Sequence, residues 1–222
     1  MYCDSALSPG CTGVNIENQH NVEFGDGLHG ILHEGGARGA VVVSHGAGRG
    51  LDTPLLEQTA TRLAVAGFSV LRWNFSYLDR RGAPSAGSKR EKAELEQAIS
   101  FVAGMGPLIL AGKSFGARVS SYVAAGRGDV RALVFYGLPL RGLGKSAKPR
   151  DWSHLGEIGA PMLFITGDRD ALCPLDQLRE AQRHIRGAFT SEIVPGDHSL
   201  KPHGEQRAID IAVEWLDKTC KR

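Results

Sequence analysis

The sequence predicts a single α/β domain, built on a mostly parallel, doubly wound sheet of about seven or eight strands with helices on both faces. The chain has 222 residues and a hydrophobic content of 42%, which is enough for one sizeable core. Short, almost continuously apolar runs recur along it, as expected for strands that are buried on both faces of a parallel sheet. These runs are AVVVSH at 40–45, FSVLRW at 68–73, PLILA at 107–111, ALVFYG at 132–137 and PMLFIT at 161–166.

Helical patterns alternate with these runs, which is typical of a doubly wound sheet. In the first of them, Thr53 and Pro54 suit the cap and the first position of a helix, and Gly67 suits its end. A last strand is expected at 190–195, before the final helix. The apolar stripes of the four helices are Leu56, Ala60, Leu63 and Ala64; Leu95, Ala98, Ile99 and Val102; Leu178, Ala181 and Ile185; and Ile209, Ala212, Val213 and Leu216.

The start of the chain has a different character. We expect residues 1–20 to form an N-terminal extension and residues 21–222 to form the domain, with an antiparallel pair of strands near NVEFG and LHGILHE. The first twenty residues lack the basic start and apolar centre of a secretory signal. No apolar run approaches the roughly eighteen residues of a membrane span. We therefore expect no membrane partner and a cytoplasmic location.

Charge and cysteine content indicate neither a nucleic-acid partner nor a metal site. The 26 basic and 24 acidic residues give a formal net charge of only +2 and are well mixed along the chain. Cys3, Cys11, Cys173 and Cys220 show no zinc-type spacing, so we expect no metal. A disulfide between Cys3 and Cys11 is the alternative to ordinary free thiols, which a reducing compartment favours.

The segment LILAGKSFGARVS, at 108–120, has two competing interpretations. A nucleotide-binding phosphate loop would need a glycine five positions before Gly112, but that position is Pro107 and the residues between them favour a strand. The same letters contain Gly-x-Ser-x-Gly, the sharp strand-to-helix turn that presents a nucleophilic serine. In this interpretation Ser114 is the nucleophile, and Gly112 and Gly116 allow strand and helix to approach closely. An ordinary N-capping serine is the structural alternative.

Acid and base candidates follow at later strand ends. Asp168 and Asp170 come directly after the strand 161–166, and His198 follows the expected strand 190–195. A serine hydroxyl needs a base to take its proton, and an imidazole performs this best when a carboxylate orients it. The order Ser, Asp, His at the ends of three strands meets that need. His203 is a weaker base candidate because it lies further from the strand end.

These motifs carry a family resemblance. HGAG at 45–48, GKSFG at 112–116, GDRD at 167–170 and GDHS at 196–199 resemble an α/β-hydrolase fold of the small, lid-poor kind related to dienelactone hydrolases. More narrowly, the chain is similar to a family of small predicted hydrolases that includes a vertebrate testis-expressed protein and, distantly, a hydrolase-like subunit of a histone acetyltransferase complex. The resemblance covers about residues 25–219.

The resemblance implies a catalytic triad of Ser114, Asp170 and His198. It selects Asp170 because the acid of the superfamily usually ends a Gly-x-x-Asp, with Asp168 as the alternative. It also implies an oxyanion hole formed by the backbone N–H groups of Ala47 and Phe115. Dienelactone hydrolases have a cysteine where this chain has Ser114, a departure that favours general serine-ester chemistry over their lactone chemistry.

The substrate cleft is expected to include residues near these motifs. Trp73, Phe75 and Tyr77 follow a strand end, and packing against the helices is the alternative role for their rings. A basic segment, RGLGKSAKPR at 141–150, lies where relatives often place a lid and is either a solvated loop or a site that attracts acidic substrates. The connection between 137 and 161 is too short for a large cap domain. The remaining cleft candidates are His45, Gly46 and Lys113.

Together these features predict a serine hydrolase that cleaves a small-molecule carboxylic ester or thioester through an acyl-enzyme on Ser114, without a cofactor. One alternative is a non-catalytic or weakly catalytic interaction module, which the relative in the acetyltransferase complex suggests. A serine peptidase is another, because it uses the same triad. The oligomeric state is left open.

Overall fold

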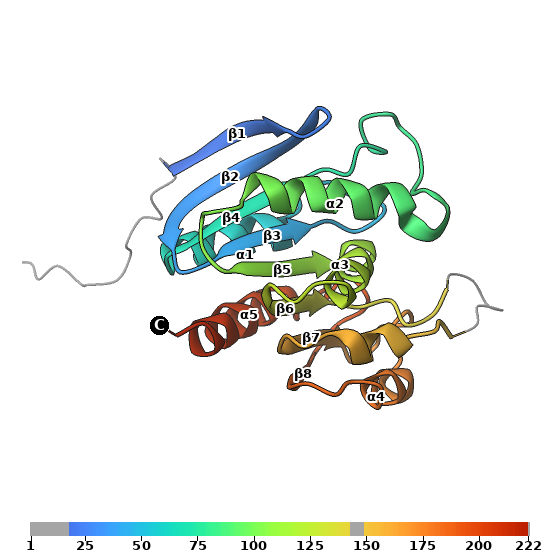
Figure 1. Ribbon diagram of the computed structural model, residues 1–222. Helices are drawn as coiled ribbons and strands as arrows, with labels where there is room; N and C mark the ends of the chain where they lie inside the picture. Colours follow the sequence, from blue (N-terminus) through green and yellow to red (C-terminus); the bar gives the residue numbers. More distant parts are fainter. Residues whose placement is uncertain (1–17, 143–148, 222) are drawn as a thin grey trace, which may run out of the picture.

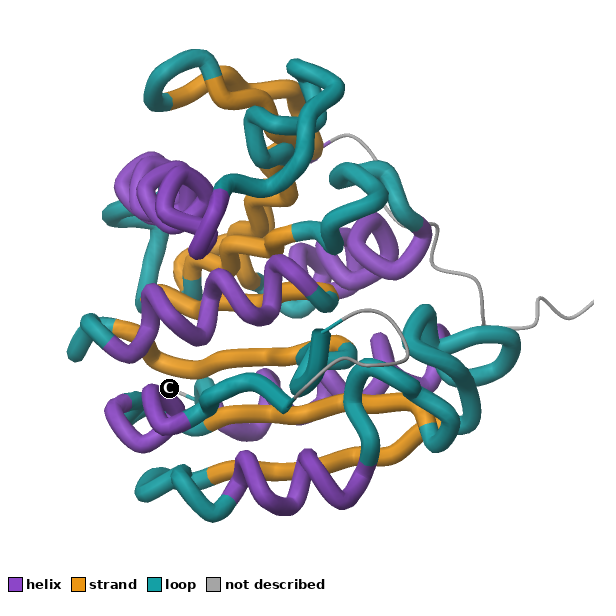
Figure 2. Tube along the Cα trace, turned by 90° about the vertical axis from the view of Figure 1, so that its right-hand side faces the viewer, coloured by secondary structure: helices purple, strands orange, loops and turns teal. Residues whose placement is uncertain are grey.

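The computed structural model describes residues 18–142 and 149–221, which form one eight-stranded sheet. The strand order is β1-β2-β4-β3-β5-β6-β7-β8, with β1 and β2 antiparallel to their neighbours and the other pairs parallel. Figures 1 and 2 show the strands side by side across the whole molecule. Their bounds are β1 Gln19–Phe24, β2 Leu28–Ala37, β3 Ala40–Ser44, β4 Phe68–Trp73, β5 Leu108–Lys113, β6 Val130–Tyr136, β7 Met162–Gly167 and β8 Phe189–Val194.

Helices cover both faces of this sheet. One face packs against α1 and α5 and the other against α2, α3 and α4, because the apolar stripes of the two groups belong to separate core clusters. The predicted α/β-hydrolase fold, a mostly parallel doubly wound sheet, is therefore confirmed. The helices are α1 Pro54–Val65, α2 Lys89–Phe101, α3 Phe115–Ala125, α4 Leu175–Gln182 and α5 Glu205–Thr219, with short 3-10 helices η2 at Ala86–Ser88 and η3 at Ser153–Glu157.

The central strands account for the apolar runs of the sequence. Val41, Val42 and Val43 of β3 are fully buried, and alternate residues of the strand belong to the two opposite core clusters. A strand with helices on both faces has no solvent-facing side, so every position must be apolar. This requirement explains why continuous apolar runs predicted the interior of the sheet.

Some boundaries differ from the prediction. Thr53 occupies the N-cap of α1, but its side chain makes no capping hydrogen bond. Helix α4 ends at Gln182, so Ile185 packs against the core from the following turn rather than from the helix. Strand β1 begins at Gln19, two residues before the expected start of the domain. Cys3 and Cys11 lie outside the described residues, whereas Cys173 and Cys220 are buried free thiols.

No helix in the described part of the chain combines the length and the apolar character needed to cross a bilayer.

His33 and His154 are among the histidines that are held in the neutral form by their surroundings. Burial and the charge of Arg72 lower the pKa of His33 to about 4, and its Nε2 accepts a hydrogen bond of 3.0 Å from Arg72 Nε. Burial likewise lowers the pKa of His154 to about 4, although the charge of Asp151 opposes the shift. The ring of His154 stacks on Tyr122 with a centroid distance of 4.0 Å.

We expect the free energy of unfolding to fall as the pH drops from 6.5 to 4. The unfolded chain binds protons at these histidines throughout that window, whereas the folded chain does not, so acid favours the unfolded state. The loss at pH 5 is on the order of 1 kcal/mol for each histidine. Urea unfolding measured across this pH range checks the slope.

The matched variants are His154→Phe, which keeps an aromatic ring against Tyr122 but cannot titrate, and His184→Phe, at an exposed position. His154→Phe should flatten the pH dependence and His184→Phe should leave it unchanged. An equal slope in the parent and His154→Phe would show that His154 does not contribute to it.

Candidate active site

Three strand ends meet at the carboxyl edge of the sheet. Ser114 follows β5, Asp170 lies in the turn after β7, and His198 lies in the loop after β8. Because these strands are parallel, their carboxyl ends lie on the same side of the molecule. Residues separated by as much as 84 positions in the sequence therefore come within hydrogen-bond distance of one another.

Ser114 occupies a strained turn between β5 and α3. Its φ of 53° and ψ of −110° lie where few residues other than glycine are found. A Cβ on Gly112 would stand 2.8 Å from Ala117 Cα, and a Cβ on Gly116 would stand 2.6 Å from the carbonyl carbon of Ser44. Both flanking positions must therefore be glycine, because the strand and the helix pass too close for side chains.

The His198 ring lies between the hydroxyl and the carboxylate. Its Nε2 is 2.7 Å from Ser114 Oγ, and its Nδ1 is 2.9 Å from both carboxylate oxygens of Asp170. An Nδ1–H that donates to the carboxylate leaves Nε2 unprotonated and able to accept the serine proton. The three residues singled out from the sequence thus share one hydrogen-bonded chain.

Asp170 is buried and its oxygens are fully engaged. The backbone N–H groups of Leu172 and Cys173 donate to Oδ1 at 2.8 and 3.1 Å, and Thr166 Oγ1 donates to Oδ2 at 3.4 Å. Burial alone would raise the pKa of this carboxyl, but the hydrogen bond and charge of His198, with smaller help from Leu172 and Lys113, lower it overall. The acid therefore stays ionised although its side chain is inaccessible to solvent.

The two alternative residues of the sequence analysis have other positions. Asp168 is exposed, and its Oδ1 accepts the backbone N–H of Gly196 at 2.8 Å. It therefore holds the loop after β8 that carries His198, the histidine loop, and does not face the imidazole. His203 is exposed beyond the turn that carries His198. Asp197 Oδ1 closes that turn by accepting the backbone N–H groups of Ser199 and Lys201 at 2.8 and 3.2 Å.

The HGAG segment passes beside the nucleophile. A Cβ on Gly46 would stand 3.6 Å from Ser114 Cβ, and Ala47 lines the same cavity as Ser114. Phe115 is the first residue of α3, so its N–H has no acceptor within the helix. Tyr77 is hydrogen-bonded to the segment: its hydroxyl donates to the carbonyl oxygen of Ala47 at 3.1 Å.

His45 lies beneath this segment and does not face the cleft as expected. It is fully buried, its Nδ1 donates to the carbonyl oxygen of Gly46 at 2.7 Å, and its Nε2 accepts the backbone N–H of Phe75 at 2.9 Å. Burial lowers its pKa, against the opposing effect of the bond to Gly46, so the ring stays neutral. His45 thereby ties the end of β3 to the end of β4.

The prediction that Trp73, Phe75 and Tyr77 line the cleft is wrong. Their exposed fractions are 0%, 0% and 1%, because they pack on one another and on Phe115. The sequence placed them correctly at a strand end, but their rings belong to the hydrophobic core. The three rings pack beneath the site and are not accessible to a substrate.

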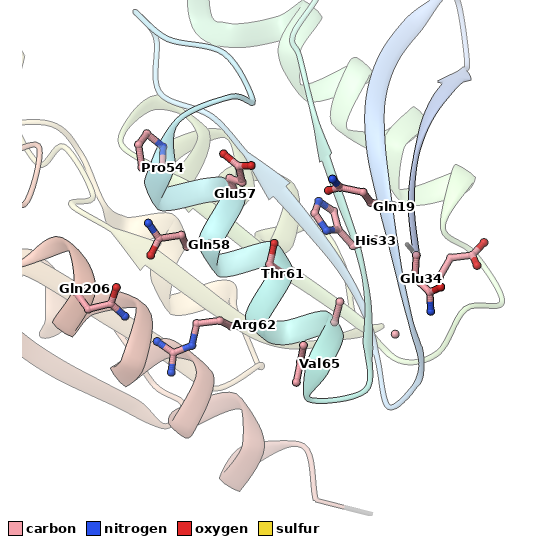
Figure 3. A pocket seen from close by; sticks show the side chains of 13 residues that line it. Gln19, His33, Glu34, Pro54, Glu57, Gln58, Thr61, Arg62, Val65 and Gln206 are labelled. Atoms are coloured by element: carbon pink, nitrogen blue, oxygen red, sulfur yellow. The ribbon is translucent and has the colours of Figure 1, made fainter. Parts of the chain in front are cut away.

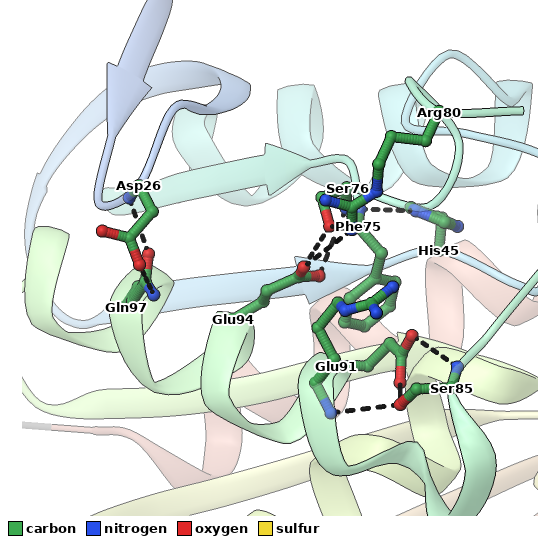
Figure 4. Close-up of polar contacts among 10 residues, drawn as sticks. Asp26, His45, Phe75, Ser76, Arg80, Ser85, Glu91, Glu94 and Gln97 are labelled. Carbon is green, nitrogen blue, oxygen red and sulfur yellow. Dashed lines mark hydrogen bonds and ion pairs between the residues drawn. The ribbon is translucent and has the colours of Figure 1, made fainter. Parts of the chain in front are cut away.

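Two buried carboxylates of α2 hold that loop in place (Figure 4). Glu91 accepts hydrogen bonds from the backbone N–H of Ser85 at 2.8 Å and from its hydroxyl at 2.6 Å. Glu94 accepts the backbone N–H of Ser76 at 3.2 Å and also bonds to the Ser76 hydroxyl. The charges of both acids, after burial, raise the pKa of Tyr77. Their role had no signal in the sequence, since both lie in an ordinary amphipathic helix.

A cavity of about 300 Å³ adjoins Ser114. Gly46, Ala47 and Lys113 border it as expected, and His198 closes it on one side. The contributions of the N-terminus of α1 and of the turn after His198 were not predicted, because their sequence patterns indicate a helix start and a base but no cleft wall. The other lining residues are Gly48, Arg49, Thr53, Pro54, Leu55, Ser199, Lys201 and Glu205.

A larger groove of about 780 Å³ lies elsewhere, between α1 and β2 (Figure 3). Its walls include His33, Glu57 and Arg62, and Val65 is exposed beside it. His33 Nε2 is already engaged by Arg72, and Arg62 is paired with Asp210. The groove holds no nucleophile beside a free base, so the smaller cavity at Ser114 is the candidate active site.

The basic segment 141–150 is only partly described, because residues 143–148 lie outside the described part of the chain. Arg141 pairs with Pro149 in an isolated bridge, and the backbone N–H of Arg150 donates to Leu140 at 2.9 Å. The proposed role of the segment in attracting acidic substrates stays a prediction.

Comparison with known proteins agrees with this fold. The model of a family described as "Alpha/beta hydrolase domain" matches residues 37–213, whereas no curated protein matches the chain. A dienelactone hydrolase from Anabaena variabilis has a TM-score of 0.74 at 22% identity, covering 90% of this chain and 98% of its own. A lid-less α/β serine hydrolase from Xanthomonas campestris has a TM-score of 0.68 at 18% identity, covering 91% and 94%.

A cold-adapted esterase from an Arctic intertidal metagenomic library has a TM-score of 0.70 at 18% identity, covering 91% of this chain and 93% of its own. At these identities the similarities establish the fold.

The close approach of Gly116 to the backbone of Ser44 and His45 leads to a testable prediction. Gly116→Ala should lower the midpoint of thermal unfolding by several degrees, because the new methyl group meets the backbone of Ser44 and His45. Gly128→Ala is the matched control, since a Cβ there meets nothing within 4 Å. Equal midpoints for the two variants, measured by circular dichroism, would contradict the packing described here.

Proposed function

Since the chain belongs to the alpha/beta hydrolase domain family, we propose that it is a serine hydrolase that cleaves a carboxylic ester or thioester. The observation that carries the proposal is the position of the His198 ring, 2.7 Å from Ser114 Oγ and 2.9 Å from Asp170. A purely structural role for His198 would not require its Nε2 to face the serine hydroxyl or its Nδ1 to face a buried carboxylate.

In the first half of the reaction, Ser114 Oγ attacks the carbonyl carbon of the substrate while His198 Nε2 takes the hydroxyl proton. The carboxylate of Asp170 stabilises the imidazolium that forms. Collapse of the tetrahedral intermediate breaks the bond to the leaving alcohol or thiol, which receives the proton from His198. The products of this step are the free alcohol or thiol and an acyl group on Ser114.

The negative charge of the intermediate falls on the former carbonyl oxygen. The backbone N–H groups of Ala47 and Phe115 are the proposed donors to it, and each such donor contributes about 3 to 4 kcal/mol to the transition state. Tyr77 donates to the Ala47 carbonyl oxygen, which holds the peptide that follows Ala47, next to the proposed donor.

In the second half, water attacks the acyl carbon and gives a proton to His198 Nε2. Return of that proton to Ser114 Oγ releases the carboxylic acid and restores the enzyme. The cavity of about 300 Å³ favours a small acyl or leaving group. This sequence of steps uses only groups of the chain and water, so no cofactor is proposed.

A fluorophosphonate should label the parent protein once, at Ser114. Ser114→Ala should abolish the adduct, and His198→Ala should slow its formation by about a thousandfold or more, because the hydroxyl loses its base. Intact-protein mass measured over time gives both results. A folded parent protein that forms no adduct would contradict the proposal.

The choice between the two aspartates has its own test. Asp170→Asn should slow labelling by about a thousandfold or more, because an amide does not hold the imidazole in the reactive tautomer. Asp168→Asn should stay within a few-fold of the parent rate, since that side chain touches only the Gly196 N–H and Arg169. The reverse order of effects would assign the acid to Asp168.

A further inference from the structure

Lys113 directly precedes the proposed nucleophile and contacts the loop that carries the proposed base. It is the last residue of β5, and its Nζ donates a hydrogen bond to the backbone carbonyl oxygen of His198. The bond joins the turn that carries the serine to the loop that carries the histidine, two segments 85 positions apart in the sequence. Its aliphatic stem passes beside Gly46, where a Cβ would stand 3.7 Å from Lys113 Cγ.

The end of β6 leaves space for this ammonium. Gly137 has a φ of 61°, and a Cβ there would lie 2.9 Å from Lys113 Nζ, 3.1 Å from Asp170 Oδ2 and 3.4 Å from His198 Cε1. All three groups therefore surround a single glycine. A side chain at this position would collide with all three groups, so the absence of one lets the ammonium lie close to the acid and the base.

The charges around Lys113 come from three loops. Asp170 lies in the turn after β7, Asp197 lies beside His198, and Glu205 begins α5; the negative charges of these carboxylates favour the ammonium form. Burial opposes them and has the larger effect, so the pKa of Lys113 is lowered to about 8. A lysine at this position changes its charge in the pH range where a hydrolase is assayed, whereas an exposed lysine does not.

We propose that Lys113 is a positioning residue whose ammonium form holds His198 in register with Ser114 and Asp170, so that loss of its charge slows the reaction. The inference rests on the proposed serine hydrolase activity and assigns Lys113 a different role from the substrate contact predicted from the sequence. Protonated Lys113 anchors the backbone of the histidine loop and also adds positive charge beside the Asp170 carboxylate. The neutral amine is a weaker donor and supplies no charge, so the loop is held less firmly.

The rate of fluorophosphonate labelling at Ser114, measured from pH 6 to pH 10, tests this role without knowledge of the natural substrate. The parent rate should fall as the pH rises through about 8. Lys113→Met keeps the length of the aliphatic stem but carries no ammonium, so it should label about tenfold more slowly at pH 7 and show no fall above pH 8. Lys218→Met, at an exposed position near the end of α5, is the matched control and should keep the parent profile.

The outcomes separate the inference from the proposed function. A parent protein that labels while Lys113→Met keeps the parent rate and the parent pH profile overturns the role of Lys113 alone. If Lys113→Met labels more slowly but its rate still falls above pH 8, the role is also overturned, because a group other than Lys113 then causes the fall in the labelling rate. A folded parent that does not label at any pH overturns the proposed function and the inference with it. Circular dichroism of each variant confirms that it is folded.

Discussion

The strained backbone of Ser114 is the constraint on which the rest of the site depends. A non-glycine residue in this conformation costs about 1–3 kcal/mol, and the surrounding sheet must supply that energy. It does so because β5 lies between β3 and β6, and the backbone N–H of Ser114 is held by the Tyr136 carbonyl at 3.0 Å. The serine is therefore fixed relative to the sheet, and the acid and the base need only reach it from neighbouring strand ends.

The surrounding loops are positioned by polar side chains, most of them buried, instead of by secondary structure. His45 joins the ends of β3 and β4, Asp168 joins the turn after β7 to the histidine loop, and the carboxylates of Glu91 and Glu94 hold the loop after β4. Each of the buried groups is hydrogen-bonded to backbone N–H or carbonyl groups or to hydroxyls, which offsets its desolvation. The result is a set of loops that converge on Ser114 with little regular structure of their own.

The sequence predicted the sheet, its helices and the order of Ser114, Asp170 and His198 because these follow from local patterns. Continuous apolar runs identify buried strands, and motifs at strand ends must lie on one edge of a parallel sheet. It did not predict the direction of side chains beyond those ends. Phe75 and Tyr77 were expected in the cleft and are buried, because α2 and the loop before it cover them through contacts that no local pattern encodes. Gly137 was missed for the same reason, since its importance arises from Lys113 and His198, far away in the sequence.

The thiol of Cys173 gives the site a property of another kind. Burial raises its pKa to about 12, and its backbone N–H is bonded to the Asp170 carboxylate. The closed site therefore offers almost no thiolate to an alkylating reagent. Because Cys173 is buried in the turn that carries Asp170, its alkylation requires this turn to open, and the alkylation rate measures how often the candidate active site opens in the native protein. The alkylation rate of Cys173 therefore reports the local stability of the candidate active site.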